Sequence, residues 1–461
     1  MNDVGSTRPT VTRLAISPIS PHINLGALRT YIYAYALARS TKNGLVILRS
    51  DDSNASIHNA SNTKQHLDFL IDKLRMKIDI HPFNSMDILR TSLFQSKRQD
   101  VYQRYLKDLE DREYLTRDGP QHLFSIEVFV RNFFDEIVTK ESVVAHRSLK
   151  NQLKMMNSGG KEMKSFPITR SDSSFLYHFA TVVDDCTMGI SHVVRGVDKQ
   201  NAVTYQEMLR IALGFQPISY LHVPLLLDSE RKRLSSRSVD GNICISSLLA
   251  SGLSMEAIIS YLCSSAYGDP EAIYHSLEEF CAIFTPSAIH KSNSIFDVKR
   301  IEFLNKYFEK KGGYHFYKNC LQSFLSEYED GLLSVKDSLM GRLYQEGTSV
   351  KLVKDSIIAM MGATQYPIQQ HMQPIVARVI DSFDRCLDVD TIFEDVCDDN
   401  KQFYSAMRLI LTGKETGLKV GHLIELSKAL GVLEKRMALA ENTLKCYKVQ
   451  VNSLQHPDKD C

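Results

Sequence analysis

Long apolar runs are missing from this sequence. A helix that crosses a membrane needs about 20 consecutive apolar residues, and no run in the chain approaches that length. The first residues are polar and lack the apolar core of a secretion signal, so we expect a cytoplasmic protein. Internal repeats and low-complexity tracts are also absent, which favours an ordinary globular chain of about two to four domains.

Net charge is low as well, because 55 basic residues nearly balance 54 acidic ones and leave +1. A nucleic-acid surface must therefore come from a local cluster of basic side chains. The nine cysteines are scattered and form no Cys-x-x-Cys pair. This spacing is typical of reduced thiols, and it argues against disulfides and against a four-thiolate zinc site.

Two apolar runs that end in charged residues dominate residues 165–199. The first run ends in Asp184 and Asp185, and the second ends in Arg195, with Asp198 three residues further on. In an α/β protein, a strand that ends in a charged residue presents it at the carboxyl edge of the sheet, where ligands bind. Arg195 is therefore a candidate anchor for an anionic substrate. The alternative is a surface arginine that follows a core strand.

The beginning of the chain predicts the first unit of a parallel sheet. A β-like run over residues 11–17 precedes a helical pattern over 24–40 and a second strand over 45–48. The first amides of such a helix carry a partial positive charge and bind phosphates. Asn24 lies at this position, where it is either a plain helix cap or a contact to a ligand.

The stretch around Arg195 resembles a signature of the glutamyl-tRNA synthetases, class I enzymes of the bacterial and organellar type. The family's Tyr-His-hydrophobic-Ala, Val-Val-Asp-Asp, Met-Gly-Ile and Arg follow here in order and at the same spacing. The matching residues are Tyr177, His178, Phe179, Ala180, Val182, Val183, Asp184, Asp185, Met188, Gly189, Ile190 and Arg195. The resemblance continues in patches over most of the chain.

This resemblance implies an α/β fold with a Rossmann-like parallel-sheet catalytic domain, an acceptor-stem insertion, and all-α stem-contact and anticodon-binding domains. The expected division is 1–10, a disordered lead; 11–75, the first half of the catalytic domain; 76–165, the acceptor-end-binding insertion; 166–240, the second half of the catalytic domain; 241–308, the helical stem-contact fold; 309–455, the helical anticodon-binding domain; and 456–461, a tail. Some relatives carry a zinc site in the insertion. Because the insertion here has no cysteine, we expect no zinc and no protein-held metal site.

The function implied by the resemblance is ATP-dependent attachment of glutamate to tRNA through a glutamyl-adenylate. Mg²⁺ should accompany the ATP, and the partner should be tRNA(Glu), with tRNA(Gln) as a second candidate, bound by a monomer. The residues implied to bind glutamate are Arg13, Ser17, Asp51, Tyr177 and Arg195. Asp51 stands where the family usually has a longer Glu that meets the substrate's ammonium group.

Both nucleotide motifs depart from the family pattern. Asn24 stands in place of the first motif's His, although Gly26 is retained, and Ser236 replaces the second Lys of the second motif. Losing such a cation at a transition state costs about 10²–10³ in rate. The residues implied to bind ATP are Asn24, Gly26, Asp198, Arg233, Ser235, Ser236 and Arg237. These departures leave open a second hypothesis, a catalytically lapsed or repurposed paralogue that still binds tRNA.

Contacts to tRNA are expected in two places. Basic residues outnumber acidic ones between positions 140 and 170, where Lys150 and Lys154 are candidate phosphate contacts. Arg408 belongs to the clearest match in the anticodon-binding part, which is otherwise identified only by its helical pattern. A solvated basic face is the alternative for the first of these clusters.

Overall fold

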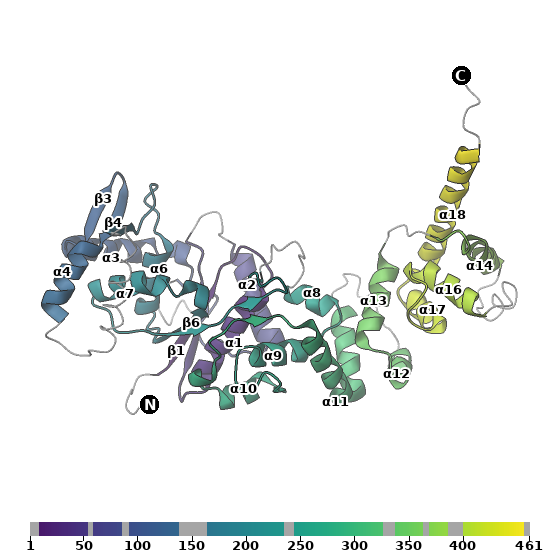
Figure 1. The fold of residues 1–461 in the computed structure, drawn as a ribbon, viewed down its shortest axis with the longest axis horizontal. Coiled ribbons are helices and arrows are strands. Elements are labelled where there is room, and N and C mark those ends of the chain that lie inside the picture. The colour runs from purple at the N-terminus through teal and green to yellow at the C-terminus, as the bar shows by residue number, and fades with distance from the viewer. Residues whose placement is uncertain are drawn as a thin grey trace, which may run out of the picture. The chain divides into compact units, whose positions relative to one another are not determined.

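The computed structural model describes most of the chain (Figure 1), namely residues 9–53, 59–84, 92–137, 164–234, 244–325, 337–362, 368–385 and 400–455. The chain divides into two compact units. Unit 1 comprises Met1–Ser246 and Met255–Ile301, and unit 2 comprises Ser247–Ser254 and Glu302–Cys461. No helix in the described ranges combines the length and the apolar character that a membrane crossing requires.

A parallel sheet forms the centre of unit 1 (Figure 1). Its strands are β1 (Val11–Ile16), β2 (Leu45–Ser50), β6 (His192–Gly196) and β7 (Ser219–Val223). β1 pairs in parallel with β2, and β6 pairs in parallel with β7. The amide of Ser191 donates to the carbonyl of Val11 over 3.0 Å, which brings β6 beside β1. The two hydrogen-bonded pairs, β1-β2 and β6-β7, therefore lie side by side with β6 next to β1, and the predicted parallel strands are confirmed.

Helix α1 (Leu25–Arg39) connects β1 to β2, as predicted. Its apolar residues Leu25, Leu28, Ile32 and Ala36 are all buried, because one face of the helix covers the sheet. The opposite face packs on α9 (Met255–Ser264) and α10 (Leu277–Ile283). A helix covered on both sides has little freedom to move, so its first residues occupy a fixed position at the carboxyl edge of the sheet.

The predicted insertion, residues 76–165, shares its hydrophobic core with residues 166–240, the predicted second half of the catalytic domain. Its elements are α3 (Gln99–Asp111), β3 (Leu115–Asp118), β4 (Gln121–Ser125), α4 (Ile126–Ile137) and β5 (Ser165–Pro167). The apolar run before Asp184 forms helix α6 (Tyr177–Thr187), which packs on α7 (Ala202–Ala212). Phe124 of β4, Phe179 of α6 and Met208 of α7 lie in one continuous buried cluster. These segments are thus held together by one core.

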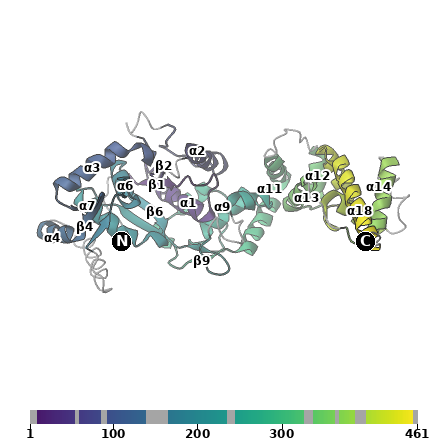
Figure 2. The same ribbon diagram turned by 90° about the horizontal axis from the view of Figure 1, so that it is seen from above.

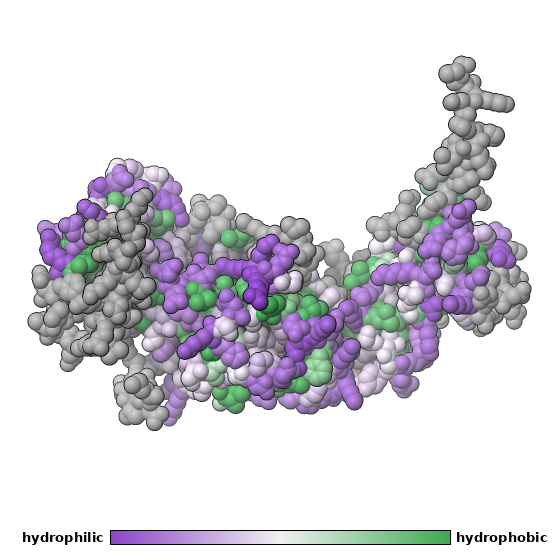
Figure 3. Space-filling view, viewed as in Figure 1, coloured by the Kyte–Doolittle hydropathy of each residue, from purple (hydrophilic) through white to green (hydrophobic). Residues whose placement is uncertain are grey.

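Shorter elements complete unit 1. They are α2 (Ala60–Asp68) with its π-helical end Phe69–Lys73, the 3-10 turns Gln95–Lys97, Val197–Lys199 and Pro286–Ala288, β8 (Leu226–Leu227), α8 (Ile245–Ala250), which runs into unit 2, and β9 (Ser294–Ile295). β9 pairs with β8, so the region expected to be all helical contains one two-residue strand. Figure 3 shows a mainly hydrophilic face on unit 1 with scattered apolar residues.

The described part of unit 2 is helical, as predicted. Its helices are α11 (Val298–Leu325), which begins in unit 1, α12 (Asp337–Gln345), α13 (Val350–Met361), α14 (Gln373–Arg385), α16 (Asn400–Thr412), α17 (Val420–Ala429) and α18 (Leu433–Gln455). α14 lies beside α18 (Figure 2). α11 bends at Gly313, whose φ of 59° is a left-handed conformation that suits glycine. The helices enclose one apolar core.

The shared core of unit 1 predicts a large effect for Phe179→Ala. Phe179 is fully buried, and removing a buried phenylalanine side chain typically costs about 3–5 kcal/mol. We expect a loss of this size in the free energy of unfolding, measured by urea denaturation. Phe83→Ala is the matched control because Phe83 is 44% exposed, and it should cost far less. Equal losses for the two variants would contradict the shared core.

Candidate functional site

Charged side chains converge at the carboxyl edge of the sheet. Arg13 comes from β1, Arg49 and Asp51 from the end of β2, Arg195 from the end of β6, and Asp185 from α6. Arg49 is completely buried, and Arg13 and Asp185 nearly so. Charges removed from water in this way are stable only when they are paired or hydrogen-bonded. The buried charges at this edge should therefore contact one another or other polar groups.

Asp185 joins the first two strands of the site. Its Oδ1 accepts a hydrogen bond from Arg13 Nε at 2.9 Å and another from Arg49 Nη1 at 2.6 Å. Burial alone would raise the pKa of Asp185, but these two guanidinium groups hold it below its ordinary value. Arg49 also donates to both oxygens of Asp51, at 2.6 and 3.3 Å. Asp51 is thus held by a residue of its own chain segment.

Asp184 is bound on the other side of the cluster. It accepts hydrogen bonds from Arg98 Nε at 2.6 Å, from Gln95 Nε2 at 2.8 Å and from the Tyr102 hydroxyl at 2.9 Å. The ion cluster, which we define as Arg13, Arg49 and Arg98 with Asp51, Asp184 and Asp185, therefore contains three positive and three negative groups. With all six groups ionised, the cluster carries no net charge.

Arg195 differs from the three arginines of the ion cluster. It is only 6% exposed, and in the described part of the chain no carboxylate lies within ion-pair distance of it. Its Nη1 donates to Gln206 Oε1 at 2.7 Å, and its guanidinium lies 4.8 Å from the centre of the Tyr220 ring. Its Nε and Nη2 are buried without any hydrogen-bond partner. Burial lowers the pKa of Arg195, because, among the described residues, the buried guanidinium has no carboxylate beside it.

Other polar atoms near Arg195 are also buried without partners. They are His178 Nδ1, Gln206 Nε2 and His222 Nε2. Burial and the positive charge of Arg195 lower the pKa values of His178 and His222, so both imidazoles are neutral at physiological pH. Buried polar atoms without partners are uncommon in proteins. Their concentration around one cation indicates a place for a polar, negatively charged ligand.

The remaining predicted glutamate residues lie at the rim. Tyr177 opens α6 and is 37% exposed, and it interacts electrostatically with both Arg13 and Arg195. Ser17 follows β1 directly and is exposed. The structure therefore gathers the predicted glutamate residues at one edge. It also shows that Asp51 is engaged by Arg49, which the sequence did not indicate.

A second concave region brings together the described residues predicted to bind ATP. Asn24 and Gly26 from the start of α1 line a pocket with Asp198 and Arg233. Arg233 Nη1 donates to Asp198 Oδ2 at 2.7 Å. A Cβ at residue 196 would lie 2.4 Å from Asp198 Oδ1, so Gly196 gives Asp198 the room for this position. We refer to this region as the nucleotide pocket.

Asn24 caps α1, since its Oδ1 accepts a hydrogen bond from the amide of Ala27 at 2.8 Å. The structure thus shows the capping role, and a contact to a nucleotide stays a prediction. Arg29 also lines the nucleotide pocket and is nearly fully buried. It donates to the carbonyl of Pro224 and to the hydroxyls of Ser265 and Ser294, so it ties α1 to the opposite wall of the pocket.

Several predicted residues cannot be placed. Ser235, Ser236, Arg237, Lys150 and Lys154 lie outside the described residues. Arg408 in α16 is half-buried, and its Nε donates to the carbonyl of Leu418 at 2.9 Å. This bond fastens the turn after α16.

Three residues important for the site were not singled out from the sequence, namely Arg49, Gln206 and Arg29. The sequence does contain features that indicate them. Arg49 is an arginine at the end of an apolar strand, and Gln206 and Arg29 are polar residues that interrupt the apolar face of a helix.

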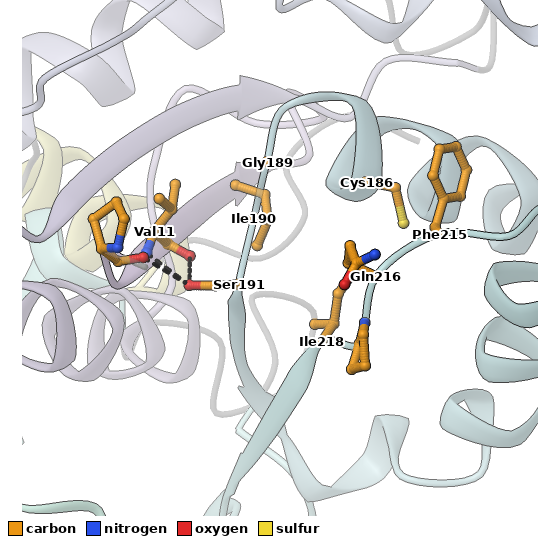
Figure 4. Close-up of a pocket in the computed structure, with 10 residues that line it drawn as sticks. Val11, Cys186, Gly189, Ile190, Ser191, Phe215, Gln216 and Ile218 are labelled. Carbon is orange, nitrogen blue, oxygen red and sulfur yellow. Dashed lines mark hydrogen bonds between the residues drawn. The ribbon is translucent and has the colours of Figure 1, made fainter. Parts of the chain in front are cut away.

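Another pocket lies at the opposite, amino edge of the sheet (Figure 4). It is lined by residues that precede β6 and β7 and by the first residue of β1, including Val11, Ser191 and Ile218. Ser191 Oγ accepts a hydrogen bond from the amide of Val11 at 2.8 Å, so this hydroxyl is already engaged within the protein. This pocket contains none of the predicted site residues. Among the described residues, no group of three or more His, Cys, Asp and Glu side chains is arranged to hold a metal.

Comparisons with known proteins show which proteins the chain resembles. A family model described as "tRNA synthetases class I (E and Q), catalytic domain" matches residues 137–303. "Glutamate--tRNA ligase 1" of Helicobacter pylori (strain ATCC 700392 / 26695) is 24% identical over 467 residues, covering 92% of this chain and 96% of the relative. "Glutamate--tRNA ligase 2" of Campylobacter concisus (strain 13826) is 23% identical over 457 residues, covering 90% and 95%.

A solved structure shares the fold. The crystal structure of a glutamate tRNA ligase from Elizabethkingia meningosepticum, in complex with its amino acid, matches with a TM-score of 0.55 and 18% identity. The match covers 95% of this chain and 99% of that structure. The predicted resemblance and the predicted α/β fold class are both confirmed.

The position of Asp185 between two arginines predicts a pH-dependent effect for Asp185→Asn. Leaving buried charges without their partner should lower the free energy of unfolding at pH 7 by about 3–5 kcal/mol. The pKa of Asp185 is lowered in the folded state. The stabilisation is therefore present above the unfolded pKa of about 3.9 and is lost as the pH falls through the folded value.

Urea denaturation of parent and variant at about pH 7 and about pH 3 measures this difference, which should be smaller at the acidic pH. Asp68→Asn is the control, because Asp68 forms an exposed pair with Lys64, and it should cost less than about 1 kcal/mol. An equal loss for Asp185→Asn at both pH values would show that the carboxylate charge is not the cause.

Proposed function

We propose that this chain, which resembles glutamyl-tRNA synthetases in sequence and in fold, attaches glutamate to tRNA in an ATP-dependent reaction. The reaction would proceed through a glutamyl-adenylate. The observation that carries this proposal is the buried guanidinium of Arg195, whose Nε and Nη2 have no partner. A buried cation with two free donors fits a carboxylate that accepts two hydrogen bonds.

Charge balance supports glutamate as the ligand. The ion cluster is neutral, so Arg195 leaves the site with one uncompensated positive charge. Free glutamate, with two carboxylates and one ammonium group, has a net charge of −1 and would neutralise it. Arg13 uses its Nε for Asp185, and we propose that its Nη groups receive the second carboxylate. Ser17, Tyr177 and Asp51 would border the amino acid, with Asp51 nearest its ammonium group.

The nucleotide pocket supports ATP as the second substrate. Asn24 and Gly26 lie at the start of α1, where helix amides favour phosphate groups. Asp198 and Arg233 form the other side, and Ser235, Ser236 and Arg237 follow directly in the sequence. Class I chemistry of this kind depends on positioning and on neutralising phosphate charge, without a covalent protein nucleophile. Mg²⁺ would accompany ATP and supply part of that positive charge.

The proposed macromolecular partner is tRNA(Glu), with tRNA(Gln) as the second candidate. Lys150 and Lys154 in the insertion and Arg408 in the helical unit are the proposed tRNA contacts. We further propose a monomer that acts in the cytoplasm, where tRNA and ATP are both present. We propose the division into domains that the resemblance implies, including the acceptor-end-binding insertion and the helical anticodon-binding domain.

A lapsed paralogue is the second candidate function, and one feature of the site favours it. Both oxygens of Asp51 are bound by Arg49, so an ammonium group must compete with a guanidinium for them. The capping bond of Asn24 likewise engages the side-chain oxygen at the first nucleotide motif. Such a protein would bind glutamate and tRNA but form adenylate slowly.

One assay separates the two candidates. ATP–pyrophosphate exchange, measured with glutamate in the presence and absence of tRNA, reports adenylate formation directly. We expect exchange that depends on glutamate. A parent protein that shows none at saturating ATP, glutamate and tRNA would rule out the ligase and leave the paralogue.

Arg195→Ala should abolish glutamate-dependent exchange while tRNA affinity stays nearly unchanged. The substitution removes the only proposed cation for one glutamate carboxylate, and leaving that group unpaired should cost about 3–5 kcal/mol of binding. Glutamate binding measured by calorimetry and tRNA binding measured by filter retention test this directly. Activity within a few fold of the parent would contradict the assignment of Arg195.

Arg233→Ala should lower the exchange rate by about 10²–10³, the usual effect of losing a preorganised charge at the transition state. Arg233 lines the nucleotide pocket, and no other described residue of its motif carries a charge. Lys232→Ala is the matched control, because the Lys232 side chain is 75% exposed and pairs with Glu230. If both variants lose activity equally, a general loss of positive charge in this loop is responsible.

A further inference from the structure

We infer that Gln206 is a positioning residue that makes the Arg195 subsite prefer a carboxylate to a carboxamide. This inference rests on the proposed function, and it takes Arg195 as the partner of the side-chain carboxylate of glutamate, the group that glutamine lacks. It goes further by assigning the choice between glutamate and glutamine to a residue that does not carry charge.

The contact between the two side chains has only one possible orientation. Gln206 lies in α7 and is 1% exposed, and its side chain meets Arg195 Nη1 at 2.7 Å. An arginine only donates hydrogen bonds, so the amide oxygen of Gln206 must face it. The amide nitrogen of Gln206 therefore points elsewhere, and it is buried without a partner. Gln206 thus fixes the guanidinium and leaves one further donor beside it.

The partner of Arg195 is neutral, in contrast to the partners of the neighbouring arginines. Arg13, Arg49 and Arg98 each contact an aspartate at 2.9 Å or less. Arg195 has the amide of Gln206 and the ring of Tyr220 instead. Gln206 therefore satisfies one donor of the guanidinium without cancelling its charge, and the whole charge remains available to a ligand.

This arrangement discriminates by charge, because glutamate and glutamine have nearly the same shape. A glutamate side chain neutralises the buried guanidinium, whereas a glutamine side chain leaves its charge uncompensated in a site removed from water. Gln206→Glu has the same shape as the parent and places a carboxylate on Arg195. A second carboxylate from glutamate would then give the subsite an excess negative charge, while a carboxamide would fit it.

The experiment compares glutamate and glutamine binding to the full chain by titration calorimetry, without ATP or tRNA. We expect the parent to prefer glutamate, and Gln206→Glu to lower the ratio of the two affinities by at least about tenfold, as expected for a change in a close charge pair. Gln206→Met is the matched control, because it removes the hydrogen bond but keeps the charge of Arg195. It should weaken both ligands and change their ratio by less than about threefold.

The outcomes separate the inference from the function on which it rests. A parent that binds neither amino acid contradicts the proposed function. A parent that binds glutamate, together with a folded Gln206→Glu protein that keeps the parent's ratio, overturns the inference alone. An equal collapse of the ratio in Gln206→Met also overturns it, because packing would then be the cause. Thermal unfolding checks each fold, and Gln206→Asp gives a second acidic variant with the same expected direction.

Discussion

The hydrogen bonds from Arg13 and Arg49 to a single oxygen of Asp185 are the interaction on which the rest of the site depends. They tie β1 and β2 to α6, three elements that are far apart in the sequence. Because the charges of the ion cluster cancel, three arginines can be buried at the sheet edge. Because these charges cancel, the charge of Arg195 is not used inside the cluster and remains available to the proposed ligand.

Burial of this kind has a consequence for rigidity. Arg49 is completely buried and held by Asp51 and Asp185, so neither aspartate can turn toward a ligand without breaking a bond inside the protein. The proposed amino-acid site is consequently preorganised, and little conformational freedom would be lost on binding. The same bonds limit what Asp51 can offer to an ammonium group. The site is therefore better prepared for carboxylates than for the amine.

Local patterns predicted the elements and Arg195, but they could not predict the pairings. The strand–helix–strand unit from Val11 to Ser50 follows from the apolar periodicity, and Arg195 follows from its place at a strand end. The role of Asp51 depends on whether Arg49, two residues away, points to the same face of the sheet edge, which the sequence does not specify. The bond between Arg49 and Asp185 joins residues 136 positions apart, and such contacts are set by tertiary packing.

The two halves of the site differ in how strongly the surrounding structure constrains them. The amino-acid half consists of buried groups that stabilise the fold, so a change there would also destabilise the protein. The described charged groups of the nucleotide pocket are less constrained, since the Arg233 side chain is 60% exposed and its pairing with Asp198 contributes little to stability. Substitutions are therefore tolerated more easily on the nucleotide side. This difference would allow a chain to keep the proposed anion site around Arg195 while its predicted nucleotide motifs change.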